Sequence, residues 1–288
     1  MKENHSTSSG PAMKRPFCLF LPMALAACQP AAAPTDKAAA APAPSPAPVV
    51  AEWKPTAFNA TSPTFSPNER SKFFTEFKSV VDKSAKGEFE TTDAYKQRLA
   101  NVDAVIQPFS TTDDYAFKPE YADLKYNADV QAYEPAYSIF CQKHWPIDKG
   151  VSCGMGSVTD STESYSGQNA FGTRAEVTSE RGRDLYFVFN PADLKGKQFR
   201  DSNSEYRLPV TCPVPIEKAR TLQGKHVLSA IVVRLRKPEI ISGHSRFEDA
   251  TVASPQAKYY ESVGIPAIFK GSLCFVQETG EILHVSSY

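Results

Sequence analysis

A stretch of 22 residues, 29–50, limits which part of this chain can form a folded domain. Fifteen of the 22 are alanine or proline, so the stretch has too little apolar side-chain surface to offset the entropy lost on folding. Its six prolines favour extended polyproline II, which at about 3.1 Å per residue gives a span of roughly 70 Å. We therefore predict one globular domain, and we place it at residues 52–288.

A short apolar run precedes this stretch. It follows Met13-Lys14-Arg15 and covers residues 16–27, which is too short for a transmembrane helix of about 20 residues. A basic start and a short apolar run are typical of a secretory signal. We predict that residues 1–27 are a signal peptide. The polar residues 1–12 are interpreted as an extension from a mis-assigned start, with translation beginning at Met13.

The run ends in Leu25-Ala26-Ala27-Cys28, which resembles the lipobox of bacterial lipoproteins. The resemblance implies cleavage before Cys28, attachment of lipid (palmitate among the acyl chains) to Cys28, and a lipid-anchored tether at residues 28–51. Several acyl chains, at about 0.8 kcal/mol per buried methylene, make a stable anchor where one chain is marginal. Gln29 occupies the position where an aspartate favours the inner membrane in this family, so the resemblance implies the outer membrane, facing the periplasm. The alternative is an ordinary cleaved signal followed by a chance cysteine.

The charge of the predicted domain argues against nucleic-acid binding. The first 51 residues hold four basic and two acidic side chains, which leaves 28 basic and 30 acidic ones beyond them and a net charge of −2. Binding to nucleic acid depends on neutralising phosphates with a surplus of basic residues. The partners that we predict are the membrane, through the lipid anchor, and either an envelope protein or a small ligand.

Four cysteines remain beyond the signal and the lipobox. Since the envelope is oxidising, Cys141, Cys153, Cys212 and Cys274 are first interpreted as two disulfides. Three pairings are open, and we favour Cys141–Cys153 with Cys212–Cys274 because the first pair closes a short, glycine-containing loop. The alternative is a zinc site formed by Cys141, His144 and Cys153. Structural zinc sites usually show two close pairs of ligands, and here there is one, so we predict no metal and no cofactor.

The start of the predicted domain has helical signals. Residues 66–69 (Ser-Pro-Asn-Glu) form a capping box with proline at the first helical position, and five apolar residues then recur at helical spacing before Gly87. Thr91 or Thr92 can cap a second helix. Within this region, residues 86–99 resemble a stretch of uncharacterised bacterial envelope proteins, a resemblance that implies no chemistry.

The remainder of the chain is rich in strand patterns. Alternating or β-branched runs predict strands, and Pro215 with Gly224 bounds a short helix. The predicted strands are 124–133, 184–189, 227–235, 268–276 and 282–285, and the predicted helix is 215–222. Helices first and strands afterwards favour an α+β fold: two N-terminal helices followed by a mainly antiparallel sheet, curved or closed into a partial barrel. The polar stretch 154–172 is interpreted as a mobile surface loop.

One short motif suggests catalysis. Gly243-His244-Ser245 resembles the start of the nucleophile elbow of α/β-hydrolases, and Asp249 and His284 are its potential partners. The fifth position of the motif is Phe247, where the elbow needs a glycine for its strained turn. A polar loop between strands is the favoured interpretation of this segment.

Two functions are consistent with the sequence. The first is a membrane-anchored envelope lipoprotein without enzymatic activity, which binds a ligand or a partner. Its twelve tyrosines and eighteen phenylalanines include candidates to line a groove for a sugar, a peptide or a lipid. The second is a periplasmic hydrolase that acts on cell-wall or lipid material, with His244, Ser245 and His284 as the candidate catalytic residues.

Overall fold

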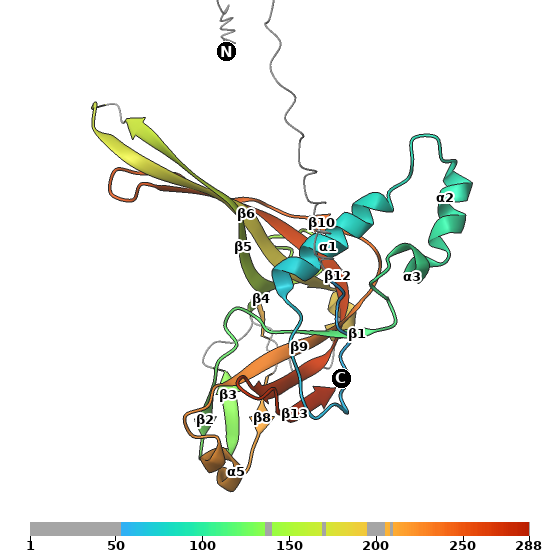
Figure 1. The fold of residues 1–288 in the computed structure, drawn as a ribbon, viewed down its shortest axis with the longest axis vertical. Coiled ribbons are helices and arrows are strands. Elements are labelled where there is room, and N and C mark those ends of the chain that lie inside the picture. Colours follow the sequence, from blue (N-terminus) through green and yellow to red (C-terminus); the bar gives the residue numbers. More distant parts are fainter. Residues whose placement is uncertain (1–52, 136–139, 169–170, 195–204, 208–209, 288) are drawn as a thin grey trace, which may run out of the picture. The chain divides into compact units, whose positions relative to one another are not determined.

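The structure, a computed structural model, describes residues 53–135, 140–168, 171–194, 205–207 and 210–287 (Figure 1). Strands contain 45% of the described residues and helices 17%. The predicted α+β class is wrong, because the described part is mainly β with five short helices and a large mixed sheet. Three strands of 18, 16 and 21 residues account for much of the difference, since an ordinary strand has about 5–6 residues.

The described helices are α1 (Arg70–Lys83), α2 (Thr92–Leu99), α3 (Val102–Val105), α4 (Pro191–Leu194) and α5 (Ile216–Thr221). α1 buries Phe73, Phe74 and Phe77 completely, and the Phe74 ring lies 5.2 Å from that of Phe187 in the sheet. α2 buries none of its residues. The helices therefore do not form the helical half of an α+β domain.

The start of α1 differs from the predicted capping box. Glu69 is the N-cap residue, and its side chain makes no capping hydrogen bond. The Asn68 side chain instead accepts a hydrogen bond from the Thr56 N–H and donates one to the Thr56 carbonyl, each at 2.8 Å. This pair of bonds fixes the chain that enters the domain. At α2 the predicted cap is confirmed, because Thr91 Oγ1 accepts from the N–H of Ala94.

The strands are β1 (Asp114–Phe117), β2 (Leu124–Asn127), β3 (Ala132–Pro135), β4 (Phe140–Lys143), β5 (Val151–Gln168), β6 (Arg174–Phe189), β7 (Glu205–Arg207), β8 (Cys212–Pro213), β9 (Val227–Leu235), β10 (Ile241–Ser242), β11 (Arg246–Glu248), β12 (Gln256–Val276) and β13 (Ile282–Ser287). Ten of them form a sheet in the order β1-β9-β12-β6-β5-β4-β7, in which β10, β11 and β13 also pair with β12. The β5–β6 hairpin extends away from the rest of the domain (Figure 1).

β12 makes the large sheet mixed. It runs parallel to β6, from Gln256 opposite Thr178 to Ala267 opposite Phe189, and antiparallel to β9 along its second half. The sheet was predicted as mainly antiparallel, and the large sheet is mixed: its β6–β12 pairing is parallel, and the other pairings among its described strands are antiparallel. The parallel pairing joins segments that are far apart in the chain, so no local sequence pattern predicts it.

Several sequence-predicted elements are confirmed. The runs 184–189 and 268–276 lie within β6 and β12, 227–235 is β9, and 282–285 opens β13. α5 lies within the helix predicted at 215–222. Two predictions are wrong: 124–133 is a hairpin of β2 and β3 and not one strand, and the predicted loop 154–172 is mostly β5.

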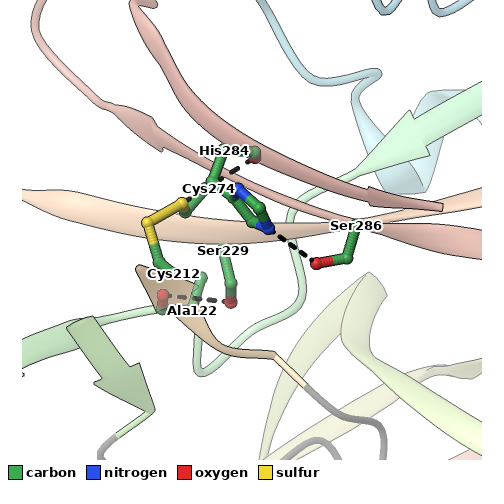
Figure 2. The surroundings of a disulfide bond; sticks show 6 residues. All are labelled: Ala122, Cys212, Ser229, Cys274, His284 and Ser286. Atoms are coloured by element: carbon green, nitrogen blue, oxygen red, sulfur yellow. Dashed lines mark hydrogen bonds between the residues drawn. A yellow bond between two sulfur atoms is a disulfide. The ribbon is translucent and has the colours of Figure 1, made fainter. Parts of the chain in front are cut away.

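A second, smaller sheet is linked covalently to the large one. It consists of β2, β3 and β8, and Cys212 of β8 forms a disulfide with Cys274 of β12 (Figure 2). Cys141 of β4 is bonded to Cys153 of β5, which faces it across the two strands. Both predicted disulfide pairings are therefore confirmed, and they fit an oxidising compartment.

Tyr115 leads to a prediction about stability at alkaline pH. Its side chain is 1% exposed, and burial raises the pKa of its hydroxyl from 10.0 to about 12. Because the folded-state pKa lies above the unfolded value, the contribution to stability is complete below pH 10 and is lost as the pH rises through 12. We expect the free energy of unfolding to fall by roughly 2 kcal/mol more in the wild type than in Tyr115→Phe over this interval.

Urea unfolding of both proteins from pH 9 to pH 12 measures this difference. Tyr115→Phe also loses the bond that the Ser110 N–H donates to the hydroxyl at 2.9 Å, which is expected to lower stability by about 1 kcal/mol at neutral pH. The effect of the Tyr115 pKa is the change with pH of the difference in unfolding free energy between the two proteins. If the two plots of unfolding free energy against pH ran parallel from pH 9 to pH 12, the prediction would be contradicted.

Candidate functional site

A hollow in the large sheet originates in the sequence of β5. Along Ser152-Cys153-Gly154 successive side chains point to opposite faces of the strand, and the pairing with β6 then shifts register between Gly154 and Gly156. Cys153 and Met155 are fully buried in the core, whereas Ser152, Gly154 and Gly156 line a cavity of about 350 Å³. Two of these three residues have no side chain, so this face of the sheet is recessed. We name the cavity the Asp184 pocket.

Asp184 is a buried carboxylate at the wall of the pocket. It lies on β6 opposite Ser157 of β5, and it is 8% exposed. Its Oδ1 accepts a hydrogen bond of 2.5 Å from Ser157 Oγ. Arg246 adds two longer bonds, from Nε to Oδ2 at 3.3 Å and from Nη2 to Oδ1 at 3.4 Å. The carboxylate charge is thus compensated inside the pocket.

Arg246 is held on three sides. Besides Asp184, it donates a hydrogen bond of 2.8 Å to Glu248, and its guanidinium lies 4.8 Å above the centre of the Tyr260 ring. The hydrogen bond to Asp184 is the largest of the effects that raise the pKa of Arg246. These contacts fix the orientation of the guanidinium, so the polar wall of the pocket is formed before any ligand arrives.

Aromatic side chains form the other walls. Trp145 and Tyr121 line the pocket and are 52% and 64% exposed. The Trp145 ring stacks on His244, with centroids 4.9 Å apart and planes 17° apart, and His244 Nε2 lies 3.2 Å from Asp148 Oδ1. Tyr186 also lines the pocket, and burial raises the pKa of its hydroxyl. The hydroxyl of Tyr186 consequently stays protonated at neutral pH.

Gly243 allows His244 to approach Trp145. A Cβ at position 243 would lie 2.6 Å from the carbonyl oxygen of Pro146 and 2.7 Å from Ile147 Cγ1. Without that atom, the His244 N–H donates to the Pro146 carbonyl at 2.8 Å. The glycine and histidine of the suspected elbow motif therefore pack the segment 243–245 against the pocket wall.

Two polar atoms near the pocket lack hydrogen-bond partners within the described ranges. They are Oγ of Ser152, in the pocket lining, and Nη1 of Arg70, and both atoms are buried. Arg70 Nη1 lies 2.6 Å from the position that a Cβ on Gly156 would take, and Glu120 Oε2 lies 3.1 Å from the same position. Burial lowers the pKa of Arg70, and the charge of Glu120 partly opposes this. A buried unpaired polar atom costs about 1–3 kcal/mol, so the Ser152 hydroxyl in the lining points to a hydrogen-bonding occupant of the pocket, whereas Arg70 lies outside this lining.

The candidate catalytic residues do not converge. Ser245 Oγ lies 3.3 Å from the Tyr259 hydroxyl, while His244 contacts Trp145 and Asp148. His284 is on β13 opposite Cys274, with Nε2 3.1 Å from Ser286 Oγ (Figure 2). Along β12, Cys274 lies 14 positions after Tyr260, the strand partner of Arg246. No hydrogen bond among the described residues joins Ser245 to either histidine.

The residues that line the pocket were not identified from the sequence; the motif at 243–245 only adjoins one of them, Arg246. The available signal was the alternation of small residues at 152, 154 and 156 with the apolar residues 151, 153 and 155, which is a strand with one recessed face. Arg70 and Glu120 offer no such signal, because only the tertiary fold brings them to Gly156.

No protein-family model matches this chain, and neither does any curated protein or solved structure. Within the described ranges, no cluster of three or more histidine, cysteine, aspartate or glutamate side chains could hold a metal ion. No described helix is both long and apolar enough to span a membrane. Cys28 and the segment 1–51 lie outside the described residues.

Proposed function

We propose that this protein is a lipoprotein of the bacterial cell envelope, anchored to the outer membrane through Cys28, whose domain binds a small ligand in the Asp184 pocket. The signal, lipobox and tether pattern of residues 13–50 supports the anchor. The two disulfides support an oxidising location outside the cytoplasm.

The observation that carries the binding function is the unpaired hydroxyl of Ser152 in a preformed cavity. Ser152 is 2% exposed and its hydroxyl has no partner in the described part of the chain. The cavity of about 350 Å³ is at the lower end of the range of roughly 300–1,000 Å³ for small-molecule sites. It combines a few fixed polar groups with aromatic walls, which is the usual composition of such a site.

The pocket lacks the arrangement of a serine hydrolase. Ser157 donates to the Asp184 carboxylate directly, whereas a nucleophilic serine needs a base such as histidine to take its proton and pass it to the leaving group. No histidine is among the described residues that line the pocket. This geometry therefore supports ligand binding better than it supports hydrolysis.

The anchor is tested by the intact mass of the full chain extracted from membranes. We expect the wild type to begin at Cys28 and to carry the mass of several acyl chains, and we expect Cys28→Ala to carry none. A wild-type chain without lipid mass would contradict the proposed anchor.

The pocket is tested by filling it. Gly154→Leu adds a side chain inside the cavity without a backbone clash, because its Cβ would lie 3.6 Å from the Tyr186 ring. Gly87→Leu is the matched control, since its Cβ would also have its nearest contact at 3.6 Å, on the exposed surface. The full chain in mild detergent is titrated with amino acids, dipeptides, sugars and phosphate esters, and binding is measured by calorimetry.

We expect at least one class of ligand to bind the wild type and Gly87→Leu saturably and Gly154→Leu at least tenfold more weakly. Equal affinity for all three proteins would mean that the ligand binds outside the Asp184 pocket. Absence of saturable binding by every class would contradict the proposed binding function. Thermal unfolding of the two variants shows whether both retain the fold.

A further inference from the structure

We infer that the ligand of the Asp184 pocket is a neutral saccharide, of the size of a mono- or disaccharide. This inference rests on the proposed binding function and specifies its ligand class. Three properties of the pocket carry it: the balance of its charges, the mixture of hydrogen-bond donors and acceptors, and the aromatic faces at its mouth.

The charged side chains that line the pocket are Asp184, Glu120 and Arg246. Arg246 forms an ion pair with Asp184, and the charge of Glu120 acts on the guanidinium of Arg70, which lies outside the pocket lining. An anionic ligand would meet the carboxylates of Asp184 and Glu120, and a cationic ligand would meet the guanidinium of Arg246. Either ligand would compete with the Asp184–Arg246 pair in a partly buried site, which is costly. A neutral ligand leaves this pair intact.

The remaining polar groups supply both donors and acceptors. Ser152, Ser157 and Gln142 line the pocket; the Ser152 hydroxyl and the Gln142 amide can donate and accept, and the Ser157 hydroxyl, which donates to Asp184, can still accept. Sugar hydroxyls match them because a hydroxyl also donates one hydrogen bond and accepts others. An apolar ligand would leave the buried Ser152 hydroxyl unpaired, and this would forfeit the binding energy that the site offers.

The aromatic rings provide flat apolar faces beside this polar wall. Trp145 is held in place by the stacked ring of His244 on one side and contributes to the pocket lining. A pyranose ring has C–H groups on its faces and hydroxyls at its edge, so it can pack on an indole while its hydroxyls reach Ser152 and Gln142. The fixed orientation of Trp145 reduces the entropy lost on binding.

Trp145 also provides the signal for a direct test. The chain has two tryptophans, Trp53 and Trp145, and Trp53 packs against Phe73 and Phe109, away from the pocket residues. In the full chain with Trp53→Phe, the fluorescence of Trp145 reports on the pocket alone. This protein serves as the reference for the titrations below.

The probes are two pairs of sugars, each with one neutral and one charged member of similar size. Chitobiose, the neutral N-acetylated disaccharide, is paired with its cationic deacetylated form, and the neutral monosaccharide N-acetylglucosamine is paired with the anionic monosaccharide glucuronate. Maltose and cellobiose test whether the acetamido group is needed. We expect saturable changes in fluorescence with at least one neutral sugar and an affinity at least tenfold lower for the charged analogue of equal size.

Ser152→Ala tests the contact that carries the inference, and Ser229→Ala is its control. Both serines are 2% exposed, but the Ser229 hydroxyl donates to the Ala122 carbonyl at 3.2 Å (Figure 2). Because the Ser152 hydroxyl is unpaired, we expect Ser152→Ala to keep or raise the stability of the protein and to weaken sugar binding about threefold to tenfold. Ser229→Ala is expected to lower stability and to leave sugar binding unchanged.

The outcomes separate this inference from the function on which it rests. If no neutral sugar gives a saturable change but another ligand class does, and Gly154→Leu abolishes that binding, the pocket binds a ligand and the saccharide inference is wrong. The inference is also wrong if charged and neutral sugars bind equally, or if Ser152→Ala binds as tightly as the reference. If no class binds at all, the proposed binding function fails as well.

Discussion

Replacing both Cys212 and Cys274 with alanine is expected to lower the free energy of unfolding by about 4 kcal/mol, in the chain-entropy model of a disulfide. The two cysteines are 62 residues apart in the sequence, and their bond closes a long loop in the unfolded chain. The bond also joins β8 of the small sheet to β12 of the large one (Figure 2). Typical domains are stable by about 5–15 kcal/mol, so this loss is a large part of the total.

The second disulfide provides the comparison. Cys141 and Cys153 are separated by 12 residues, so their removal as Cys141→Ala with Cys153→Ala is expected to cost about 3 kcal/mol, which is less than the cost for the longer loop. Urea unfolding of both double variants and the wild type, without reductant, measures the two losses. The reduced wild type should be no more stable than either variant. An unchanged midpoint for the Cys212 and Cys274 variant would contradict the prediction.

The disulfide pairing and the buried strands were predictable because their signals are local. β9 is a run of apolar residues of strand length, and nearly all of its side chains are buried. Such a run is typical of a strand covered on both faces. The pairing of Cys141 with Cys153 follows from the short glycine-containing loop between them, and the other two cysteines are then the remaining pair.

β5 shows why other elements were missed. Beyond Ser157, most of this strand is exposed on both faces, because it forms part of a hairpin that extends from the domain (Figure 1). A strand without a buried face has no alternation of apolar and polar residues, so its sequence has the polar composition of a loop. The parallel pairing of β6 with β12 is non-local, and it likewise leaves no trace in either segment alone.

The candidate site was predictable only in part. The motif at 243–245 resembles the start of a nucleophile elbow, but its glycine permits close packing on Pro146 and its histidine stacks on Trp145. A short sequence motif is compatible with several structural roles, and the residues that surround it in the fold determine which role it has. Arg70 and Glu120 come from separate segments before β2, and only the fold places them beside Gly156.

Phe73→Ala is the core substitution with the largest expected effect. Phe73 is completely buried, and its ring contacts five others at centroid distances of 4.7–6.4 Å, those of Trp53, Phe77, Phe109, Tyr115 and Phe117. Truncation removes apolar contacts and leaves a cavity between α1 and the sheet, which cannot collapse because rigid rings surround it. We expect a loss of about 4 kcal/mol in the free energy of unfolding.

Phe89→Ala is the matched control, since the Phe89 side chain is 93% exposed. The same change of side chain there is expected to alter stability by less than about 0.5 kcal/mol. Urea unfolding of both variants under oxidising conditions distinguishes the effect of losing a buried ring from the effect of the Phe→Ala change itself. Because α1 supplies three fully buried phenylalanines to this core, a small effect of Phe73→Ala would mean that the helix does not pack on the sheet as the structure shows. Such a result would also remove the support for the position of Arg70, the first residue of α1, beside the Asp184 pocket.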